Sequence, residues 1–187
     1  KVTSGSPNPF SVFYRNESNT LISASPERFL SSFNGRIISQ PMKGTAPRSS
    51  NSKKDADLKN GLRSSAKECS ENVMIVDLVR NDFSRIASSG SVQVDELFGV
   101  HTFPASHQMI STISCKPRPE IHFTDILKAT FPMGSMTGAP KISAMKIIEE
   151  HENFSRGLFS GSIGYIDPEG NFDFNVIIRC ILLDHHQ

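Results

Sequence analysis

Apolar and polar positions alternate in short runs through the first 48 residues, which is the period of β-strands. Turn-forming residues separate these runs, and Asn34-Gly35 is a dipeptide that favours a two-residue type I′ hairpin turn. The pattern therefore predicts four strands before the first helix, at residues 9–15, 20–26, 29–33 and 36–40.

The predicted hairpin also sets which later residues face each other. Counting outward from a two-residue turn places Glu27 opposite Met42 and Pro26 opposite Lys43, so that Glu27 and Lys43 are near neighbours. A strict register points these two side chains to opposite faces. Only a bulge, or an end of the ladder at Pro41, lets them converge, and the sequence leaves this open.

Apolar residues then recur at helical spacing from Leu58 to Val79, which predicts one long helix that ends near Ile86. The first half of this helix is amphipathic. Residues 73–79 are apolar nearly all round, which predicts that this end is buried in the body of the protein.

The remaining pattern alternates between strands and short helices. We predict strands at 92–103 and 107–113, a helix at 123–131 with Thr124 as N-cap, and a helix at 140–152 with Pro140 in its first turn. Residues 158–166 and 171–183 predict a closing hairpin around a turn at 167–170. The whole chain, 1–187, reads as one α+β domain in which antiparallel β-sheet layers pack against helices.

Composition narrows the classes of partner. The 20 basic and 19 acidic residues are mixed along the chain, so no basic surface for nucleic acid or membranes is expected, and a small molecule or a protein is the expected partner. Three cysteines, far apart and without a CxxC, argue against a disulfide framework and a thiolate metal site, and favour a reducing cytosol. No apolar run approaches the roughly 20 residues of a membrane span, and no leader sequence is evident.

Two groups of polar residues on the first half of the chain could carry chemistry. The stretch QPMKGTAPR contains Lys43, which the bend does not need, so it is either a solvated loop residue or a placed amine. Glu68 and Glu71 lie on one helix face, where they suit Mg²⁺ or form a solvated acidic surface, and spacing alone favours the second. The charged residues that follow are expected to form a structural network: Asp77, Arg80, Asn81, Asp82 and Arg85.

The second half contributes three more candidates. The small-residue loop at 134–140 runs into a helix N-terminus and is a plausible carboxylate cradle, although such loops are more often tight turns. Arg179 interrupts the apolar second strand of the closing hairpin, whose first strand carries Tyr165. It requires an anion, either a ligand carboxylate or Asp173. His107 follows a strand, where a lone histidine is usually structural.

Taken together, these segments resemble the chorismate-utilising enzymes. The motifs SASPERFL, PMKGTAPR, KECSENVMIVDLVRNDFSRI, HQMIST, FPMGSMTGAPKISAMKIIEE and GSIGYIDPEGNFDFNVIIR occur in one order and cover nearly the whole chain. The family has anthranilate, isochorismate and salicylate branches, which usually carry a small residue before Gly-Thr. A lysine there, as at Lys43, is typical of the branch that forms aminodeoxychorismate from chorismate for folate synthesis.

The resemblance implies a mechanism. Glu27 would be the general acid for the departing C4 hydroxyl of chorismate, Lys43 would attack C2, and ammonia would then displace the lysine by attacking C4. Glu71 would be a ligand of Mg²⁺, with Glu68 in the same metal and water shell. A glutamine amidotransferase partner would supply the ammonia in the cytoplasm.

The resemblance also implies the substrate-binding residues. Arg179 and Tyr165 would bind the enolpyruvyl carboxylate, and residues 134–141 would line the ring-carboxylate and metal side. His107 matches a histidine tied to pyruvate elimination in the anthranilate branch. The full set of implied substrate-binding residues is Thr45, Gly134, Thr137, Gly138, Ala139, Lys141, Gly161, Ser162, Tyr165 and Arg179.

The chain departs from the family pattern at both ends. Family members carry a long segment before the equivalent of Lys1, and after the equivalent of Gln187 a glycine-rich stretch with the second acidic metal ligand. We therefore expect an incomplete, C-terminal portion of the chorismate-binding fold that binds Mg²⁺ weakly. Anthranilate or isochorismate chemistry is the alternative within the family, and a catalytically incomplete binding fragment is the alternative outside enzyme function.

Overall fold

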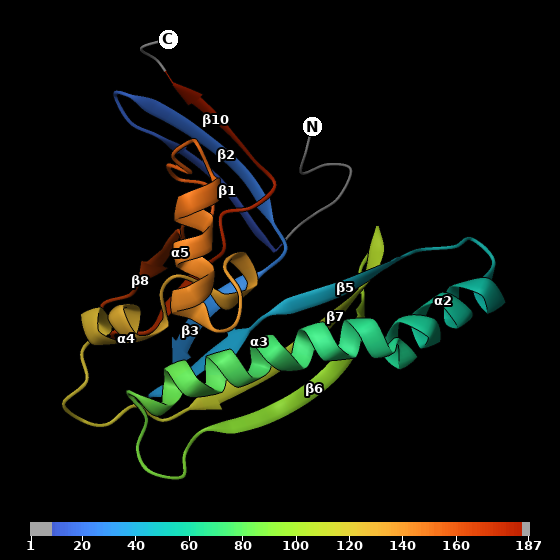
Figure 1. Ribbon diagram of the computed structural model, residues 1–187, viewed down its shortest axis with the longest axis horizontal. Coiled ribbons are helices and arrows are strands. Elements are labelled where there is room, and N and C mark those ends of the chain that lie inside the picture. The colour runs from blue at the N-terminus through green and yellow to red at the C-terminus, as the bar shows by residue number, and fades with distance from the viewer. Residues whose placement is uncertain (1–8, 185–187) are drawn as a thin grey trace.

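The computed structural model describes residues 9–184, which form two antiparallel sheets with helices packed on the larger one (Figure 1). The smaller sheet has the order β1-β2-β10, with β1 Phe10–Arg15, β2 Asn19–Ser25 and β10 Cys180–Asp184. The larger sheet has the order β5-β7-β4-β3-β9-β8, and β6 pairs with β7. Its strands are β3 Arg28–Phe33, β4 Arg36–Gln40, β5 Met42–Pro47, β6 Gln93–Thr102, β7 Ser106–Cys115, β8 Gly164–Ile166 and β9 Phe172–Asn175.

The hairpin predicted at Asn34-Gly35 is confirmed. Both turn residues have positive φ, 50° and 73°, as a type I′ turn requires, and Phe33 pairs with Arg36. The register then shifts by one residue between Ser31 and Arg28. This shift supplies the bulge on which the convergence of Glu27 and Lys43 depended.

The prediction of one long helix over residues 58–86 is wrong in one respect, because this part of the chain forms two helices. They are α2 Ser52–Ser64 and α3 Ala66–Ser84, and Ser65 between them is extended (φ −68°, ψ 108°). The Ser65 hydroxyl accepts a hydrogen bond from the backbone N–H of Glu68, 3.4 Å away, and so caps α3. Serine competes for backbone hydrogen bonds in this way, which favours a cap over a continuous helix.

Helix α3 lies along the larger sheet (Figure 1) and buries one face against it. Ile75, Val76 and Phe83 are buried in the main hydrophobic core, whereas Val73 and Met74 are exposed. The prediction that residues 73–79 are buried all round is therefore wrong, since the sheet covers only one side of the helix.

The other helices begin close to their predicted positions. They are α4 Phe123–Thr130 and α5 Lys141–His151, and the loop predicted between them contains the 3₁₀ turn η1 Gly134–Met136. The N-cap of α4 is His122, not Thr124, and the Asp125 carboxylate accepts a hydrogen bond from the His122 backbone N–H. Pro140 is the N-cap of α5 and not part of its first turn. No helix among the described residues is long and apolar enough to cross a membrane.

The predicted closing hairpin is confirmed only for β8 and β9, where Tyr165 pairs with Asp173. Residues 171–183 do not form one strand. The chain leaves the larger sheet after Asn175 and joins the smaller one as β10, which pairs with β2. Val176 and Ile177 are buried in this crossing, and Arg179 at its end has a φ of 49°. The apolar run thus serves two sheets, which its composition alone does not distinguish from one long strand.

The closeness of β8 to β9 yields a stability prediction. A Cβ on Gly164 would lie 2.1 Å from the backbone oxygen of Asp173, whereas a Cβ on Gly61 in α2 would meet nothing within 4 Å. Gly164→Ala is expected to lower the free energy of unfolding by about 1–3 kcal/mol. Gly61→Ala is expected to raise it by about 0.5–1 kcal/mol, because alanine favours a helix interior over glycine. Urea unfolding of both variants tests this, and equal midpoints would contradict the described packing of β8.

Candidate active site

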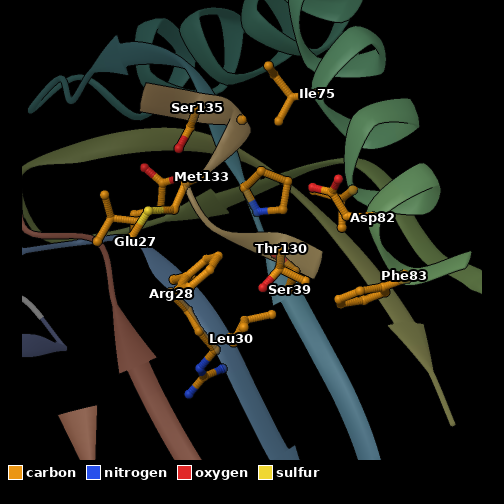
Figure 2. Close-up of a pocket in the computed structure, with 15 residues that line it drawn as sticks. Glu27, Arg28, Leu30, Ser39, Ile75, Asp82, Phe83, Thr130, Met133 and Ser135 are labelled. Atoms are coloured by element: carbon orange, nitrogen blue, oxygen red, sulfur yellow. The ribbon is translucent and has the colours of Figure 1, made fainter. Parts of the chain in front are cut away.

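Glu27 lies in the connection between β2 and β3 and is only 5% exposed. The Ser135 side chain approaches its carboxyl group from η1 (Figure 2) and is hydrogen-bonded to it. The carboxyl group is also hydrogen-bonded to the backbone of Met42. Burial raises the pKa of Glu27 to about 7, while these hydrogen bonds and the charge of Lys43 act in the opposite direction. Glu27 is therefore a carboxyl group that can donate a proton near neutral pH.

Lys43 lies on β5, directly after Pro41 ends the ladder of β4. Its Nζ is 3.9 Å from Oε2 of Glu71 on α3, and its side chain is about one-third exposed. The β5–β7 pairing contains its own register shift, between Met42 and Thr45, on either side of Lys43. Two irregularities therefore flank the place where Glu27 and Lys43 meet.

Glu27 and Lys43 line one pocket of about 140 Å³, the Lys43 pocket, which is formed by Pro26, Glu27, Met42, Lys43, Gly44, Thr45, Gln108, Ile178 and Arg179. Thr45 donates a hydrogen bond from Oγ1 to Oε1 of Gln108, 2.7 Å away across the β5–β7 pair. The pocket thus brings together four residues predicted from the sequence: Glu27, Lys43, Thr45 and Arg179.

Arg179 reaches this pocket from the crossing between the two sheets. Among residues 9–184, its guanidinium lies within ion-pair distance of no carboxylate. Asp173, the alternative partner, is bound by Arg28 at 2.9 Å. An arginine that keeps its charge at the rim of a pocket suits an anionic ligand.

Glu68 and Glu71 lie on the α3 side of Lys43, at the bend that Gly44 makes. Gly44 has a φ of 91°, which favours glycine, and a Cβ there would come within 2.9 Å of Oε2 of Glu68. Within the described part of the chain, no group of three or more His, Cys, Asp or Glu side chains could hold a metal ion. Proteins usually bind Mg²⁺ through one or two carboxylates, while substrate and water supply the other ligands. The pair Glu68 and Glu71 fits this pattern.

The loop before α5 packs its backbone against α3. Gly134 is buried, and a Cβ there would lie 2.5 Å from Cδ2 of Leu78. The Thr137 hydroxyl donates within the loop, to the Met133 carbonyl. Gly138 and Ala139 continue the chain into α5, and none of these four predicted residues lines the Lys43 pocket. Ser135 of this loop is hydrogen-bonded to the Glu27 carboxyl group.

Lys141 is not directed into the Lys43 pocket. Its Nζ donates to Oδ2 of Asp82 at 2.5 Å and to the Thr130 carbonyl at 2.8 Å, and its side chain is largely buried. Of the predicted charged network, Asp77 and Arg80 pair with each other, whereas Asp82 is bound by Lys141 from another helix. Figure 2 shows Asp82 and Glu27 at opposite ends of a second, internal pocket.

Three other predicted substrate-binding residues, Gly161, Ser162 and Tyr165, lie in β8 or directly before it. The Gly161 carbonyl accepts a hydrogen bond from the Ile177 N–H, and the Ser162 hydroxyl donates to the Asn175 carbonyl at 2.5 Å. Tyr165 on β8 is 65% exposed. The structure does not bring these three residues into the Lys43 pocket.

His107 is buried on the opposite face of β7 from Gln108, since neighbouring strand residues alternate. Its ring nitrogens lie 3.1 Å from Oδ1 of Asp55 and 3.0 Å from Oγ1 of Thr102. Asp55 is also bound by Arg48 at 3.0 Å, and these hydrogen bonds hold its pKa well below its usual range. His107 therefore ties the start of α2 to the sheet and does not line the Lys43 pocket.

A model of the chorismate binding enzyme family matches residues 1–187. The chain belongs to this family. It is 47% identical over 173 residues to aminodeoxychorismate synthase component 1 of Escherichia coli (strain K12), a match that covers 92% of this chain and 38% of that protein. The chloroplastic aminodeoxychorismate synthase of Arabidopsis thaliana is 44% identical over 180 residues, covering 95% of this chain and 20% of that protein.

A solved structure of a similar protein has the same fold. Anthranilate synthase component I from Streptococcus pneumoniae TIGR4 matches with a TM-score of 0.88 and 35% identity, over 98% of this chain and 40% of that one. The resemblance read from the motifs is confirmed, as is the α+β fold with antiparallel sheets. The chain spans less than half the length of these proteins and represents part of the family fold.

Two residues of the site were not singled out from the sequence. Ser135 lies inside the predicted loop, and its small polar side chain gave no sign that it would contact Glu27. Gln108 neighbours His107, and pairing of β5 with β7 would have placed it opposite Thr45. Only the register of two strands more than 60 residues apart could have identified Gln108.

The buried carboxyl group yields a prediction on the pH dependence of stability. Because the folded pKa of Glu27 lies above its usual value of 4.5, its contribution to the free energy of unfolding is fully present below about pH 4.5 and is lost as pH rises through about 7. The loss is on the order of 3 kcal/mol. Glu27→Gln should therefore gain stability relative to the unchanged protein between pH 5 and 8.

Thermal unfolding across this pH range measures the difference. Glu17→Gln, which changes an exposed glutamate, is the matched control and should run parallel to the unchanged protein. A Glu27→Gln profile that also runs parallel would show that Glu27 is not buried as described.

Proposed function

We propose that this chain carries the catalytic centre for converting chorismate and ammonia to 4-amino-4-deoxychorismate, the aminodeoxychorismate synthase reaction. The observation that carries the proposal is the meeting of Glu27 and Lys43 in one pocket. The names of its relatives in bacteria and plants support the same reaction.

The first step forms a covalent adduct. Nζ of Lys43, as the free amine, attacks C2 of chorismate, the two ring double bonds shift, and the C4–O bond breaks. Glu27 gives its proton to the departing oxygen, which leaves as water, and the carboxylate then takes a proton from the new ammonium nitrogen. A pKa of about 7 suits Glu27 to both directions of transfer.

The second step reverses the first with a different nucleophile. Ammonia attacks C4, the double bonds shift back, and the C2–N bond breaks with its electron pair returning to Lys43. Glu27 supplies the proton that the leaving amine nitrogen needs and regains one from the new ammonium group. The ring thus acquires the nitrogen of ammonia, and the enolpyruvyl ether remains intact.

Chorismate carries two carboxylates, and the pocket offers positive charge for them. Arg179, free of carboxylate partners among residues 9–184, would bind one of them. Glu71, with Glu68, would hold Mg²⁺, which supplies charge neutralisation for the other carboxylate when bound. Both glutamates lie on the α3 side of Lys43, which supports this assignment.

The ammonia would come from a glutamine amidotransferase. The name of the Escherichia coli relative, component 1, supports a separate partner for this task. The cysteines Cys69, Cys115 and Cys180 are unpaired, which supports a reducing compartment, and the proposal places the reaction in the cytoplasm.

The proposed adduct gives a direct test in the full-length protein. Incubation with chorismate and Mg²⁺ without ammonia should add the mass of chorismate less one water, mapped to Lys43. Lys43→Arg should abolish the added mass, since a guanidinium does not lose its proton at neutral pH. Lys67→Arg is the matched control, because Lys67 also lies within 4.0 Å of Glu71, and it should leave the adduct intact.

Intact-mass spectrometry followed by peptide mapping measures the result. If no adduct forms although chorismate is still consumed, Lys43 is not a nucleophile. The anthranilate and isochorismate reactions of the other family branches would then be the better description.

The metal assignment gives a second test that does not depend on turnover. Mg²⁺ with chorismate should raise the melting temperature of the full-length protein, because a ligand that binds only the folded state stabilises it. Glu71→Gln should reduce this rise by raising the Mg²⁺ concentration needed about tenfold or more. Asp77→Asn, further along α3, is the control and should leave the rise unchanged. An undiminished rise in Glu71→Gln would remove Glu71 from the metal site.

A further inference from the structure

Arg156 lies in the irregular connection between α5 and β8, outside every motif residue assigned above. Its guanidinium donates in several directions at once. Nε and Nη2 bind both carboxylate oxygens of Glu152 at 2.7 and 2.5 Å. Nη1 donates to the Met136 carbonyl at 3.0 Å and to the Ser160 hydroxyl at 3.2 Å. A planar fork with fixed donors suits such a multiple contact.

The two acceptors of Nη1 belong to different segments, and hydrogen bonds connect each segment to Glu27. Met136 directly follows Ser135, whose side chain is hydrogen-bonded to the Glu27 carboxyl. Fixing the Met136 carbonyl therefore fixes the end of η1 that presents Ser135 to the acid.

The second route runs through the backbone of the crossing. The Ser160 N–H donates to the Ile177 carbonyl at 3.0 Å, and the neighbouring Val176 N–H donates to the Glu27 carbonyl at 3.1 Å. Fixing Ser160 therefore helps to fix the backbone that carries Glu27. Arg156 is the side chain that joins both routes.

The Glu152 pair alone does not explain this arrangement. An ion pair four residues apart at the end of α5 would serve the helix with Nε and Nη2 only. Nη1 is directed away from the helix, to two segments that are 24 residues apart in sequence. Lys141 ties the ends of the same loop through the Thr130 carbonyl, and the other hydrogen bond of its Nζ goes to Asp82 on α3.

We propose that Arg156 is a positioning residue that holds η1 and residues 158–162 together, and so sets Ser135 and the backbone of Glu27 for proton transfer. The inference rests on the proposed role of Glu27 as general acid. Arg156 acts through these segments and does not itself touch the Lys43 pocket.

Hydrogen exchange in the full-length protein tests the structural half of the proposal without any activity measurement. Arg156→Gln should speed amide exchange by about tenfold or more in both segments, 134–137 and 158–162, since a charge-assisted hydrogen bond holds each. Arg80→Gln, which removes an exposed arginine paired with Asp77 on α3, should leave both unchanged. Arg156→Lys keeps the charge but not the fork, and it is expected to show the same pattern at smaller size.

Faster exchange in only one segment, or equally throughout the protein, would overturn the inference. If Arg156→Gln does not fold, the Arg156→Lys pattern decides between these outcomes. This result stands whether or not Lys43 forms an adduct, so it separates failure of the inference from failure of the proposed function.

The catalytic half is tested by coupling to Ser135. Arg156→Gln should lower kcat about tenfold in the unchanged background and less than twofold in a Ser135→Ala background, because the two substitutions remove the same positioning. Arg80→Gln should leave kcat unchanged in both. Equal losses in the two backgrounds would show that Arg156 does not act through Ser135.

Discussion

The site depends on a one-residue shift in the pairing of β3 with β4. Side chains alternate between the two faces of a strand, so a strict register from the Asn34-Gly35 turn would direct Glu27 and Lys43 to opposite faces. The shift between Ser31 and Arg28 lies at the end of the strand pair away from the turn, and it reverses which face each later side chain points to. Glu27 and Lys43 then share a pocket, and the reaction we propose requires that they do.

Burial of Glu27 has two consequences with one physical cause. Removing a carboxylate from water costs free energy, which the chain offsets in part with the Ser135 side chain and the Met42 backbone. The remaining cost raises the pKa of Glu27 to about 7. A group that reduces stability at neutral pH is thereby able to donate a proton there, as is common for catalytic acids.

The crossing between the two sheets is the second element that organises the site. It buries Val176 and Ile177, bonds the backbone of Glu27 through Val176, and delivers Arg179 to the pocket. Three cations around the site differ in their surroundings: Lys141 is bound to Asp82 and Arg156 to Glu152, but Arg179 has no such partner in the described part of the chain. This difference separates the arginine suited to a ligand from the two residues that hold the fold.

The sequence by itself determined the local features and the family. Alternation predicted β1 to β4 but not β5, which occupies residues expected to form a bend. Asn34-Gly35 predicted the hairpin, and the order of the motifs predicted the chorismate binding family, because each of these signals lies within a short stretch of chain. It could not place the break at Ser65, since a serine can sit inside a helix or cap one. Tertiary structure decided the bulge beside Glu27, the division of residues 171–183 between two sheets, and the partners of Lys141, Ser135 and Arg156. These depend on contacts between segments far apart in sequence, where burial and packing choose among conformations that are locally equivalent.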